Sequence, residues 1–376
     1  MLIPDGDESR ALKVVQSLAI TGKTKVFIVL TKDRIVKYSR FCLPFYIPNN
    51  AGNDEINVCM KDVLKRYPID AILPIGEEGI RYIHSNDWLR KWNIAPLPEM
   101  HTLNSVSNKW SLNNLLRDLG LDSPHSIIIT NKGDVDKIAE IKNYPVLIKP
   151  TQSEGGIGIV FVENRESLHK QIAKELIYGG NSEYIVQEYI EGSIMSISLL
   201  CNYGKILAFE IHQPIDKAFK ELTFSRMIEF ITDSSLLEYC QELISRIKWS
   251  GVANMDFIKE KAGGKLFLLD FNPRFWGTLI GSTWAGVNFP YLACLSAMGI
   301  SYPLPKYKNI KYYGLEKGQM LPFLFSNKEN KVDSIRNSSI YMFLLDPLPK
   351  IMNQLPAAII RALSPSWSGK TGQVHK

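Results

Sequence analysis

The chain has 376 residues, with 45% hydrophobic and 22% charged side chains and a formal net charge of +6. This length suggests roughly two or three domains, and so small and diffuse a charge favours anionic small ligands such as nucleotides over nucleic acid. The cysteines are scattered without a CxxC pair, acids follow soon after Met1 and no apolar run is long enough to span a membrane. These features argue against a disulfide framework, a zinc site, a signal peptide and a transmembrane segment, so we expect a cytoplasmic protein.

The N-terminal part of the chain alternates short apolar runs with helical patterns. Strands are expected at residues 1–4, 25–30 and 71–75, and helices at 9–18 and 56–67. This alternation predicts a parallel α/β layer. Its loops carry acids that could meet a ligand at the carboxyl ends of the strands, or could only cap helices. These acids are Asp5, Asp7, Glu77 and Glu78.

A linker and a helix that carries Lys109 are expected next. Residues 88–98 are rich in Trp and Pro, and residues 101–119 have the pattern of one helix closed by Gly120. A strand at 126–130 and a helix at 134–142 follow.

The segment 144–162 reads YPVLIKPTQSEGGIGIVFV and predicts two strands joined by a glycine-rich loop. Glycines let backbone N–H groups wrap phosphate oxygens, and Lys149 on the first strand adds a positive charge. A buried lysine needs a partner, which favours phosphate binding over an ordinary turn. The loop matches neither the Walker A nor the Rossmann signature.

Strands are expected at 184–189, 194–200 and 206–211, between helices at 166–177 and 233–247. Gln187 and Glu188 close the first of these strands at a bend. Backbone groups and apolar side chains at such a bend can hold a purine ring, although an ordinary strand end would read the same way.

The segment from Gly251 to Gly277 predicts a hairpin whose two strands bring acids side by side. Asp270 and Asn272 share a strand face, and Asp256 lies on the neighbouring strand. Two carboxylates and an amide oxygen suit a hard cation such as Mg²⁺. Arg274 would follow beside the metal as a donor to phosphate or carboxylate. A hairpin with only a surface ion pair is the alternative.

The C-terminal part reads differently. A helix is expected at 291–298, and an amphipathic run at 350–363 precedes an end that looks disordered. This run could form a lid, a dimer contact or a membrane-surface helix. Packing within the protein or in an oligomer is preferred, and a homodimer is left open.

In order and spacing, these motifs resemble the ATP-grasp superfamily of carboxylate–amine/thiol ligases, in the branch of carbamoyl-phosphate synthase, biotin carboxylase and the pyrrolysine-pathway ligase. The resemblance implies an N-terminal parallel α/β (pre-ATP-grasp) domain at 1–100, followed by a two-lobed ATP-grasp fold. The small lobe would cover 101–190 and the large lobe 191–305, with an extension at 306–376. The class is thus α/β and α+β.

The resemblance also implies roles for individual residues. Lys109 and Lys149 would contact the nucleotide phosphates, and Arg274 would stabilise the transferred phosphate or bind the acid substrate. Arg226 loosely matches an arginine near the acceptor site. The nucleotide would further be held by a flexible loop and by the hinge, which comprise Glu154, Gly155, Gly156, Ile157 and Gly158, and Gln187, Glu188, Tyr189 and Ile190. Asp256, Asp270 and Asn272 would hold Mg²⁺, or Mn²⁺ in its place.

The chain departs from the family pattern in three places. Ser193-Ile194-Met195 stands where a ribose-binding glutamate often follows the hinge, and Asp270 replaces a longer glutamate. The basic cluster after the central strand is reduced to His212-Gln213-Pro214.

The implied reaction joins a small-molecule carboxylate to an amine through an acyl phosphate, with ADP and phosphate as products. A catalytically impaired ATP-binding scaffold is one alternative, and a bicarbonate-using carboxylase is another.

Overall fold

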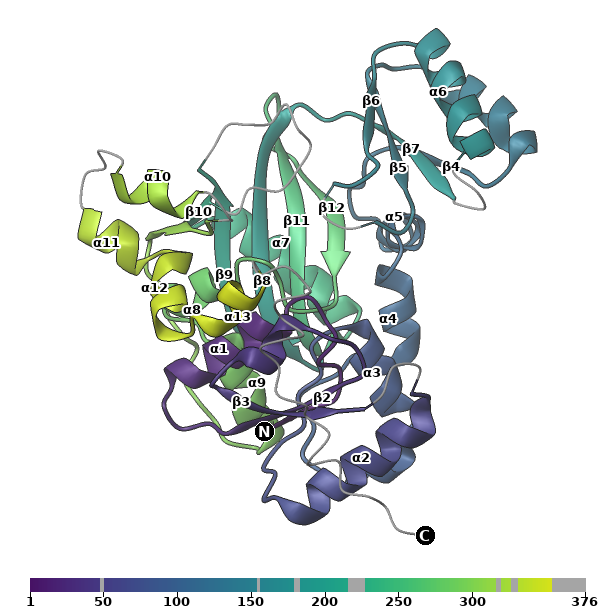
Figure 1. Ribbon diagram of the computed structural model, residues 1–376. Coiled ribbons are helices and arrows are strands. Elements are labelled where there is room, and N and C mark those ends of the chain that lie inside the picture. The colour runs from purple at the N-terminus through teal and green to yellow at the C-terminus, as the bar shows by residue number, and fades with distance from the viewer. Residues whose placement is uncertain are drawn as a thin grey trace.

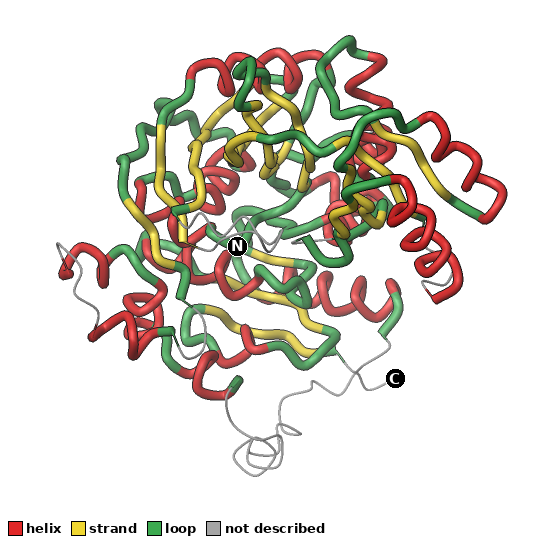
Figure 2. The backbone as a smooth tube through the Cα atoms, turned by 90° about the horizontal axis from the view of Figure 1, so that it is seen from above, coloured by secondary structure: helices red, strands yellow, loops and turns green. Residues whose placement is uncertain are grey.

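The computed structural model describes residues 1–47, 51–153, 156–178, 183–215, 227–315, 319–325 and 331–353. Its strands form three separate sheets, one in each of three successive stretches of the chain. The small N-terminal sheet, the large central sheet and the outlying four-stranded sheet are apparent in Figure 1. Seen from above in Figure 2, strands lie toward the interior and many of the helices toward the outside.

The N-terminal sheet is parallel, with the order β1-β2-β3. Its strands are β1 (Leu2–Ile3), β2 (Val26–Leu30) and β3 (Cys42–Tyr46). Helices α1 (Ala11–Ile20), α2 (Asn53–Arg66) and α3 (Glu77–His84) accompany them. β2 is buried along its whole length because Ile28 and Leu30 enter one core cluster while Phe27 and Val29 enter another. This confirms the predicted parallel α/β layer.

One predicted strand of this layer is wrong. Residues 71–75 form only isolated bridges at Ile72, to Leu2 and Ile94. Pro74 lacks a backbone N–H and so limits the ladder that this segment can make. A short 3-10 helix, η2 (Asp87–Lys91), lies within the predicted linker; another, η1 (Ile35–Tyr38), precedes β3.

The single helix predicted at 101–119 is in fact two helices, α4 (Met100–Val106) and α5 (Lys109–Asp118). The break lies at Asn108, whose side-chain oxygen accepts hydrogen bonds from the backbone N–H groups of Trp110 at 2.8 Å and Ser111 at 3.3 Å. Asparagine favours this N-cap position, so it begins a new helix. As a result, Lys109 occupies the first residue of α5.

The small lobe is a four-stranded antiparallel sheet in the order β4-β7-β5-β6. Its strands are β4 (Ser126–Ile129), β5 (Val146–Pro150), β6 (Val160–Val162) and β7 (Tyr184–Glu188). Helix α6 (Arg165–Tyr178) and the 3-10 helix η3 (Lys132–Glu140) pack on one face through Leu168, Ile172 and Ile138. η3 replaces the helix expected at 134–142.

The large lobe is built on a six-stranded sheet in the order β12-β11-β8-β9-β10-β13. The strands are β8 (Gly192–Asn202), β9 (Lys205–Pro214), β10 (Met227–Ile231), β11 (Gly251–Glu260), β12 (Leu266–Asn272) and β13 (Lys311–Tyr313). One face packs on α5 and α7 (Ser234–Arg246), where Leu236 and Cys240 meet Met255, Phe257 and Phe271. This face is the hydrophobic core of the lobe.

The opposite face of this sheet changes character along the strands. At one end Leu200 and Ala208 pack against α1, α8 (Leu279–Ala285) and α9 (Phe289–Ala297). Two rows of polar residues follow across neighbouring strands: Asn272, Asn254, Ser198 and Glu210, then Asp270, Asp256, Ser196 and His212. Apolar Ile258 and Ile194 come last. This polar face is therefore closed by packing at one end and leads to apolar side chains at the other. α8 had not been predicted.

A β-bulge interrupts the regular pairing of β11 with β12 between Asp256 and Phe257. Asp256 pairs with Asp270, whereas Phe257 pairs with Leu268, so Leu269 is an extra residue in β12. The bulge shifts the alternation by one position. Asp270 and Leu268 consequently lie on opposite faces although they are two residues apart.

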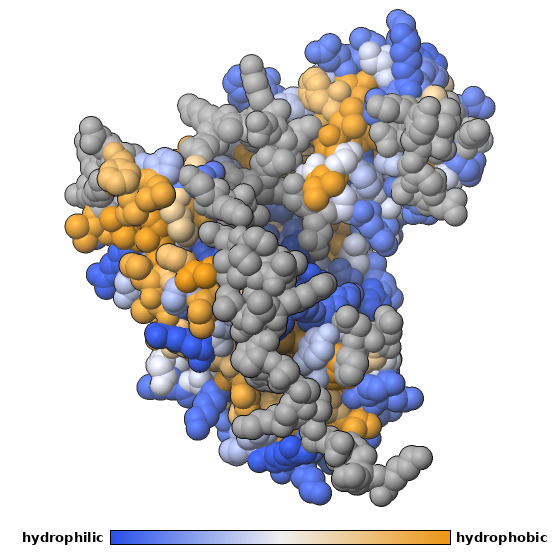
Figure 3. Space-filling model, viewed as in Figure 1, coloured by the Kyte–Doolittle hydropathy of each residue, from blue (hydrophilic) through white to orange (hydrophobic). Residues whose placement is uncertain are grey.

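The C-terminal extension folds back against the rest of the protein. It contains α10 (Met320–Phe325), α11 (Lys331–Arg336), α12 (Ser339–Leu345) and α13 (Leu348–Met352). Buried Asp346 accepts hydrogen bonds from Gln16 at 3.1 Å and Ser39 at 2.7 Å, which fastens this extension to the N-terminal layer. Apolar side chains gather on its outer side in Figure 3. Phe325 and Leu344 are among the exposed apolar residues of this extension. Most of the predicted amphipathic run and the whole of the expected disordered end lie outside the described residues.

Candidate active site

A cleft with about 870 Å³ of empty space lies between the small and large lobes. Its lining comes from α5, the small-lobe strands and glycine loop, the hinge and the large sheet. The lining residues are Lys109, Leu147, Lys149, Ser153, Gly156, Ile159, Gln187, Glu188, Tyr189, Ile190, Ile194, Ile258, Leu269 and Asp270. The glycine loop and the acidic end of β12 therefore face one shared space.

Lys149 lies on β5 and is only 5% exposed. Its Nζ donates a 2.6 Å hydrogen bond to Gln187 on the neighbouring strand β7. Gln187 donates in turn to Ser126 at 3.1 Å, which holds the amide oxygen toward the lysine. Burial and the nearby charge of Lys109 lower the pKa of Lys149 to about 8. Among the described residues no carboxylate forms an ion pair with Lys149, so this cation is suited to an incoming anion.

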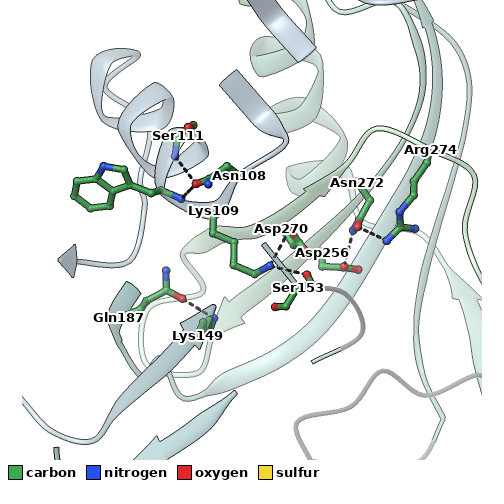
Figure 4. A network of polar contacts seen from close by, with 11 residues as sticks. Asn108, Lys109, Ser111, Lys149, Ser153, Gln187, Asp256, Asp270, Asn272 and Arg274 are labelled. Carbon is green, nitrogen blue, oxygen red and sulfur yellow. Dashed lines mark hydrogen bonds and ion pairs between the residues drawn. The ribbon is translucent and has the colours of Figure 1, made fainter. Parts of the chain in front are cut away.

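Lys109 approaches the same cleft from the start of α5. Its Nζ donates to the backbone oxygen of Ser153 at 2.9 Å and lies 3.9 Å from Oδ1 of Asp270 (Figure 4). The backbone N–H of Lys109 also donates to Thr151 at 3.2 Å. One side chain thus joins the base of the glycine loop to the acid on β12.

The acids Asp256 and Asp270 face each other across the β11–β12 pair. Asp256 is 5% exposed and accepts hydrogen bonds from Ser196 at 2.6 Å and from Asn272 at 3.3 Å. Burial, together with the charge of Asp270, raises the pKa of Asp256 to about 6. A bound cation would relieve this repulsion between like charges.

Arg274 lies just beyond the acids. Its guanidinium donates to Asn272 Oδ1 at 2.7 Å (Figure 4). It also donates to the backbone oxygen of Phe275 at 3.3 Å. The N–H of Phe275 bonds to Ile75 in the N-terminal layer, which fixes the chain after Pro273. Among the described residues, no three or more His, Cys, Asp or Glu are placed to hold a metal. A site of two acids and one amide falls below that number, but Mg²⁺ commonly takes few protein ligands and completes its shell with water and phosphate.

The hinge joins the lobes at Glu188, Tyr189 and Ile190. Glu188 accepts a 2.7 Å hydrogen bond from the backbone N–H of His125, and its own N–H donates to the same residue. Tyr189 stacks edge-on against Phe161, with ring centroids 5.2 Å apart. The hinge wall of the cleft is otherwise apolar, as a purine site requires.

The glycine loop is described only in part. Gly156 and Gly158 have φ values of 80° and 78°, which favour glycine, and a Cβ on Gly158 would come within 2.9 Å of Pro150. Ile157 is 74% exposed and does not line the cleft, so its side chain does not form the wall of the expected phosphate loop. Glu154, Gly155 and Arg226 lie outside the described residues.

The carboxylates of Asp5 and Asp7 bond to backbone N–H groups of neighbouring segments in the N-terminal layer. Asp5 accepts hydrogen bonds from the N–H groups of Ile75 and Gly76, and Asp7 accepts from those of Thr31 and Lys32. These contacts are not helix capping, because the N-cap residues of α1 and α3, Arg10 and Gly76, make no side-chain cap hydrogen bond, and Thr31 and Lys32 follow β2. The capping alternative therefore does not describe Asp5 and Asp7.

Sequence reasoning missed the polar residues of the central strands. Ser196 and Ser198 on β8, and Glu210 and His212 on β9, occupy the same sheet face as the acids. Their signal was the spacing of two between polar residues in otherwise apolar strands. In the sequence, His212 stands out only as the remnant of a basic cluster.

Two lobes, each built on an antiparallel sheet, enclose a cleft that carries lysines next to facing acids. This arrangement defines a class of nucleotide-binding folds. Residues 106–278 match the family model described as the ATP-grasp domain, so this part of the chain carries an ATP-grasp domain. The predicted recognition and fold class are thereby confirmed.

Similar proteins agree with this assignment. The carbamoyl phosphate synthase large chain of Bifidobacterium longum (strain DJO10A) is 22% identical over 251 residues, which cover 64% of this chain and 22% of that one. N5-carboxyaminoimidazole synthetase from Staphylococcus aureus, complexed with ADP, matches with a TM-score of 0.64 at 17% identity, covering 81% of this chain and 79% of that one. A biotin carboxylase–β-γ-ATP complex from Campylobacter jejuni gives a TM-score of 0.59 at 16% identity, covering 81% and 73%.

These similarities differ in what they show. The chain spans only about a fifth of the length of the curated relatives it matches, since the coverage of the first is 22%. The structural matches are below 25% identity and show the shared fold. In the part of the chain that the structure describes, no helix combines the length and apolarity needed to cross a bilayer.

Proposed function

We propose that this protein is an ATP-dependent ligase that activates a small-molecule carboxylate as an acyl phosphate and joins it to an amine. The observation that carries the proposal is the shared cleft, which is lined by Lys109, Lys149 and Asp270, with Asp256 paired to Asp270 on the neighbouring strand. Cations for phosphates and acids for a divalent metal converge there from separate elements. Relatives bound to ADP and to a β-γ-ATP support ATP as the nucleotide.

The residues present fit a magnesium ion. Asp256 and Asp270 carry like charges on facing positions, and their repulsion helps to raise the pKa of Asp256. Asp256, Asp270 and Asn272 would hold Mg²⁺, which supplies charge neutralisation for the phosphates. Support for Mn²⁺ in this position comes only from its similar ligand preference.

The remaining roles follow from charge and position. Lys149 and Lys109 would bind phosphate oxygens, with the glycine loop closing over them. Apolar side chains that line the cleft, among them Leu147 and Ile258, would contact the adenine ring beside Glu188. Phosphoryl transfer needs alignment and charge neutralisation rather than covalent help, and this cleft offers both. Arg274 would hold the carboxylate substrate or the transferred phosphate.

The proposal includes the division into an N-terminal domain at 1–100, lobes at 101–190 and 191–305, and an extension at 306–376.

A catalytically impaired scaffold is the second candidate. It is favoured by Ser193-Ile194-Met195, which stands where the family often has a ribose-binding glutamate, and by the short side chain of Asp270. Glu191, the acid just after the hinge, is 69% exposed and pairs with Lys261 at 2.7 Å.

The test is ADP release from Mg-ATP with pools of carboxylic acids and hydroxylamine, which converts acyl phosphates to hydroxamates. Wild-type protein should form ADP and hydroxamate together, whereas Lys149→Met and Asp270→Asn should slow both by about a hundred- to a thousandfold. Lys170→Ala is the control, because Lys170 is 76% exposed and pairs with Glu166 on α6, outside the cleft lining.

Three outcomes separate the candidates. Nucleotide binding without ADP release with any acid would favour the scaffold. ADP release that responds to bicarbonate alone would favour a carboxylase. Unchanged turnover in both variants would refute the assignment of the cleft.

A further inference from the structure

A second polar cluster lies on the cleft face of the large sheet, beyond the proposed metal acids. Glu210 on β9 is fully buried at 0% exposure, and its carboxylate accepts hydrogen bonds from Ser282 and from Nδ1 of His212, both at 2.9 Å. Ser282 also accepts from Trp276 at 3.1 Å. A buried carboxylate is costly unless its oxygens are bonded, so this network fixes Glu210 firmly.

The network sets the orientation and tautomer of His212. Because the Glu210 carboxylate only accepts hydrogen bonds, Nδ1 of the neutral imidazole carries the proton and Nε2 keeps its lone pair. Phe230 meets the ring edge-on, with centroids 5.9 Å apart. Among the described residues, Nε2 of His212 has no hydrogen-bond partner. One basic nitrogen is thus left available.

The strand register places this nitrogen in line with the acids. His212, Ser196, Asp256 and Asp270 occupy successive strands in one row of the same face. Neighbouring strands lie about 4.8 Å apart, which puts His212 about 10 Å from Asp256 along the row. Ser196 lies between the two and donates to Asp256 at 2.6 Å, so the imidazole is the next ionisable side chain along the row from the metal acids.

We propose that His212, held by Glu210, is the catalytic residue that accepts a proton from the ammonium group of the acceptor substrate. This inference rests on the proposed ligase function and deepens it, because it assigns the acceptor as a protonated primary amine. An ammonium ion has no lone pair with which to attack a carbonyl, so a base must first remove a proton. Although burial opposes it, the charge of Glu210 raises the pKa of His212, so the neutral imidazole is a stronger base for that task.

The step balances in atoms and charge. His212 takes one proton from the ammonium group, and the amine nitrogen then forms the new C–N bond with the acyl carbon. The bond between that carbon and the phosphate oxygen breaks, and its electron pair leaves with phosphate. The second proton lost from nitrogen goes to the departing phosphate. The products are the amide, hydrogen phosphate and protonated His212.

The experiment compares two nucleophiles in the full-length protein. Hydroxylamine is uncharged at neutral pH and needs no such base, whereas pooled amino acids present ammonium groups. For His212→Gln we expect wild-type hydroxamate formation but amide formation reduced by about a hundredfold or more in kcat. Glu210→Gln should reduce amide formation in the same selective way, since it weakens the hold on the imidazole.

The control is Gln213→Ala, which changes the next residue of β9 on the other face of the sheet, where Gln213 bonds to Glu229 at 2.7 Å. It should leave both products unchanged. If Glu210→Gln does not fold, His212→Gln alone tests the proposal. Hydroxamate formation by this variant would show that its cleft is folded.

Each result has a distinct meaning. Equal loss of both products in His212→Gln would show a structural role and overturn the proton-acceptor role, and unchanged amide formation would overturn it as well. Wild-type protein that makes hydroxamate but no amide with any amino acid would overturn the amine assignment while leaving acid activation intact. Wild-type protein that makes neither product would overturn the ligase proposal, and this inference with it.

Discussion

Replacing Lys149 by methionine should separate the stability of this protein from its nucleotide binding. The lysine is buried, and burial lowers its pKa from 10.5 to about 8. A lowered pKa means that the folded state binds the proton less tightly than the unfolded state. The charge therefore costs stability below pH 8, and this cost disappears as the pH rises through 10.5.

The magnitude follows from the two pKa values. Their difference corresponds to about 3 kcal/mol at pH 7, which methionine would remove from the folded protein. Against this, the side-chain oxygen of Gln187 loses its 2.6 Å hydrogen bond, at a cost of about 1–3 kcal/mol. The free energy of unfolding of the nucleotide-free variant should therefore equal that of wild type or exceed it by up to about 2 kcal/mol.

The assay is urea unfolding with and without Mg-ATP. Wild type should gain about 3 kcal/mol at a nucleotide concentration a hundred times its dissociation constant, and Lys149→Met should gain almost nothing. The control Lys170→Ala should match wild type in both conditions. A nucleotide-free Lys149→Met protein that is clearly less stable than wild type, yet still stabilised by Mg-ATP, would refute the view of Lys149 as an uncompensated phosphate-binding cation.

The other predictions concern single contacts. Asp346→Ala should lower the free energy of unfolding by about 2–4 kcal/mol, because buried Gln16 and Ser39 lose their acceptor. Urea unfolding checks this against Asp333→Ala, which changes an exposed residue of α11. Asn108→Ala should cost about 1 kcal/mol by removing the cap of α5, and an unchanged urea midpoint would contradict the capping role. Burial raises the pKa of Asp5 from 3.8 to about 7, so stability from this group is full below pH 3.8 and is lost as the pH rises through 7, by at most about 4 kcal/mol. Asp5→Asn should flatten stability between pH 4 and 7, and an unaltered pH profile would rule this out.

Much of the site could be predicted from local pattern. Lys149 stands out as a lysine in an apolar strand, and the spacing of Asp270 and Asn272 places both on one face. The facing of Asp256 and Asp270 follows from a hairpin of neighbouring strands. These predictions depend only on alternation within a strand and on a short turn, both of which are local properties of the chain.

The sequence by itself determined the residue types and their spacing, and with them the parallel N-terminal layer and the acidic hairpin. Only the tertiary structure decided which distant strands became neighbours. His212 lies beside Ser196 and in line with Asp256 because β9, β8 and β11 are hydrogen-bonded in that order. Asp346 meets Ser39 across 307 positions of chain. The bulge in β12 likewise arises from pairing with β11. Pairing between remote segments depends on the packing of the whole core, and alternation within one strand carries no information about it.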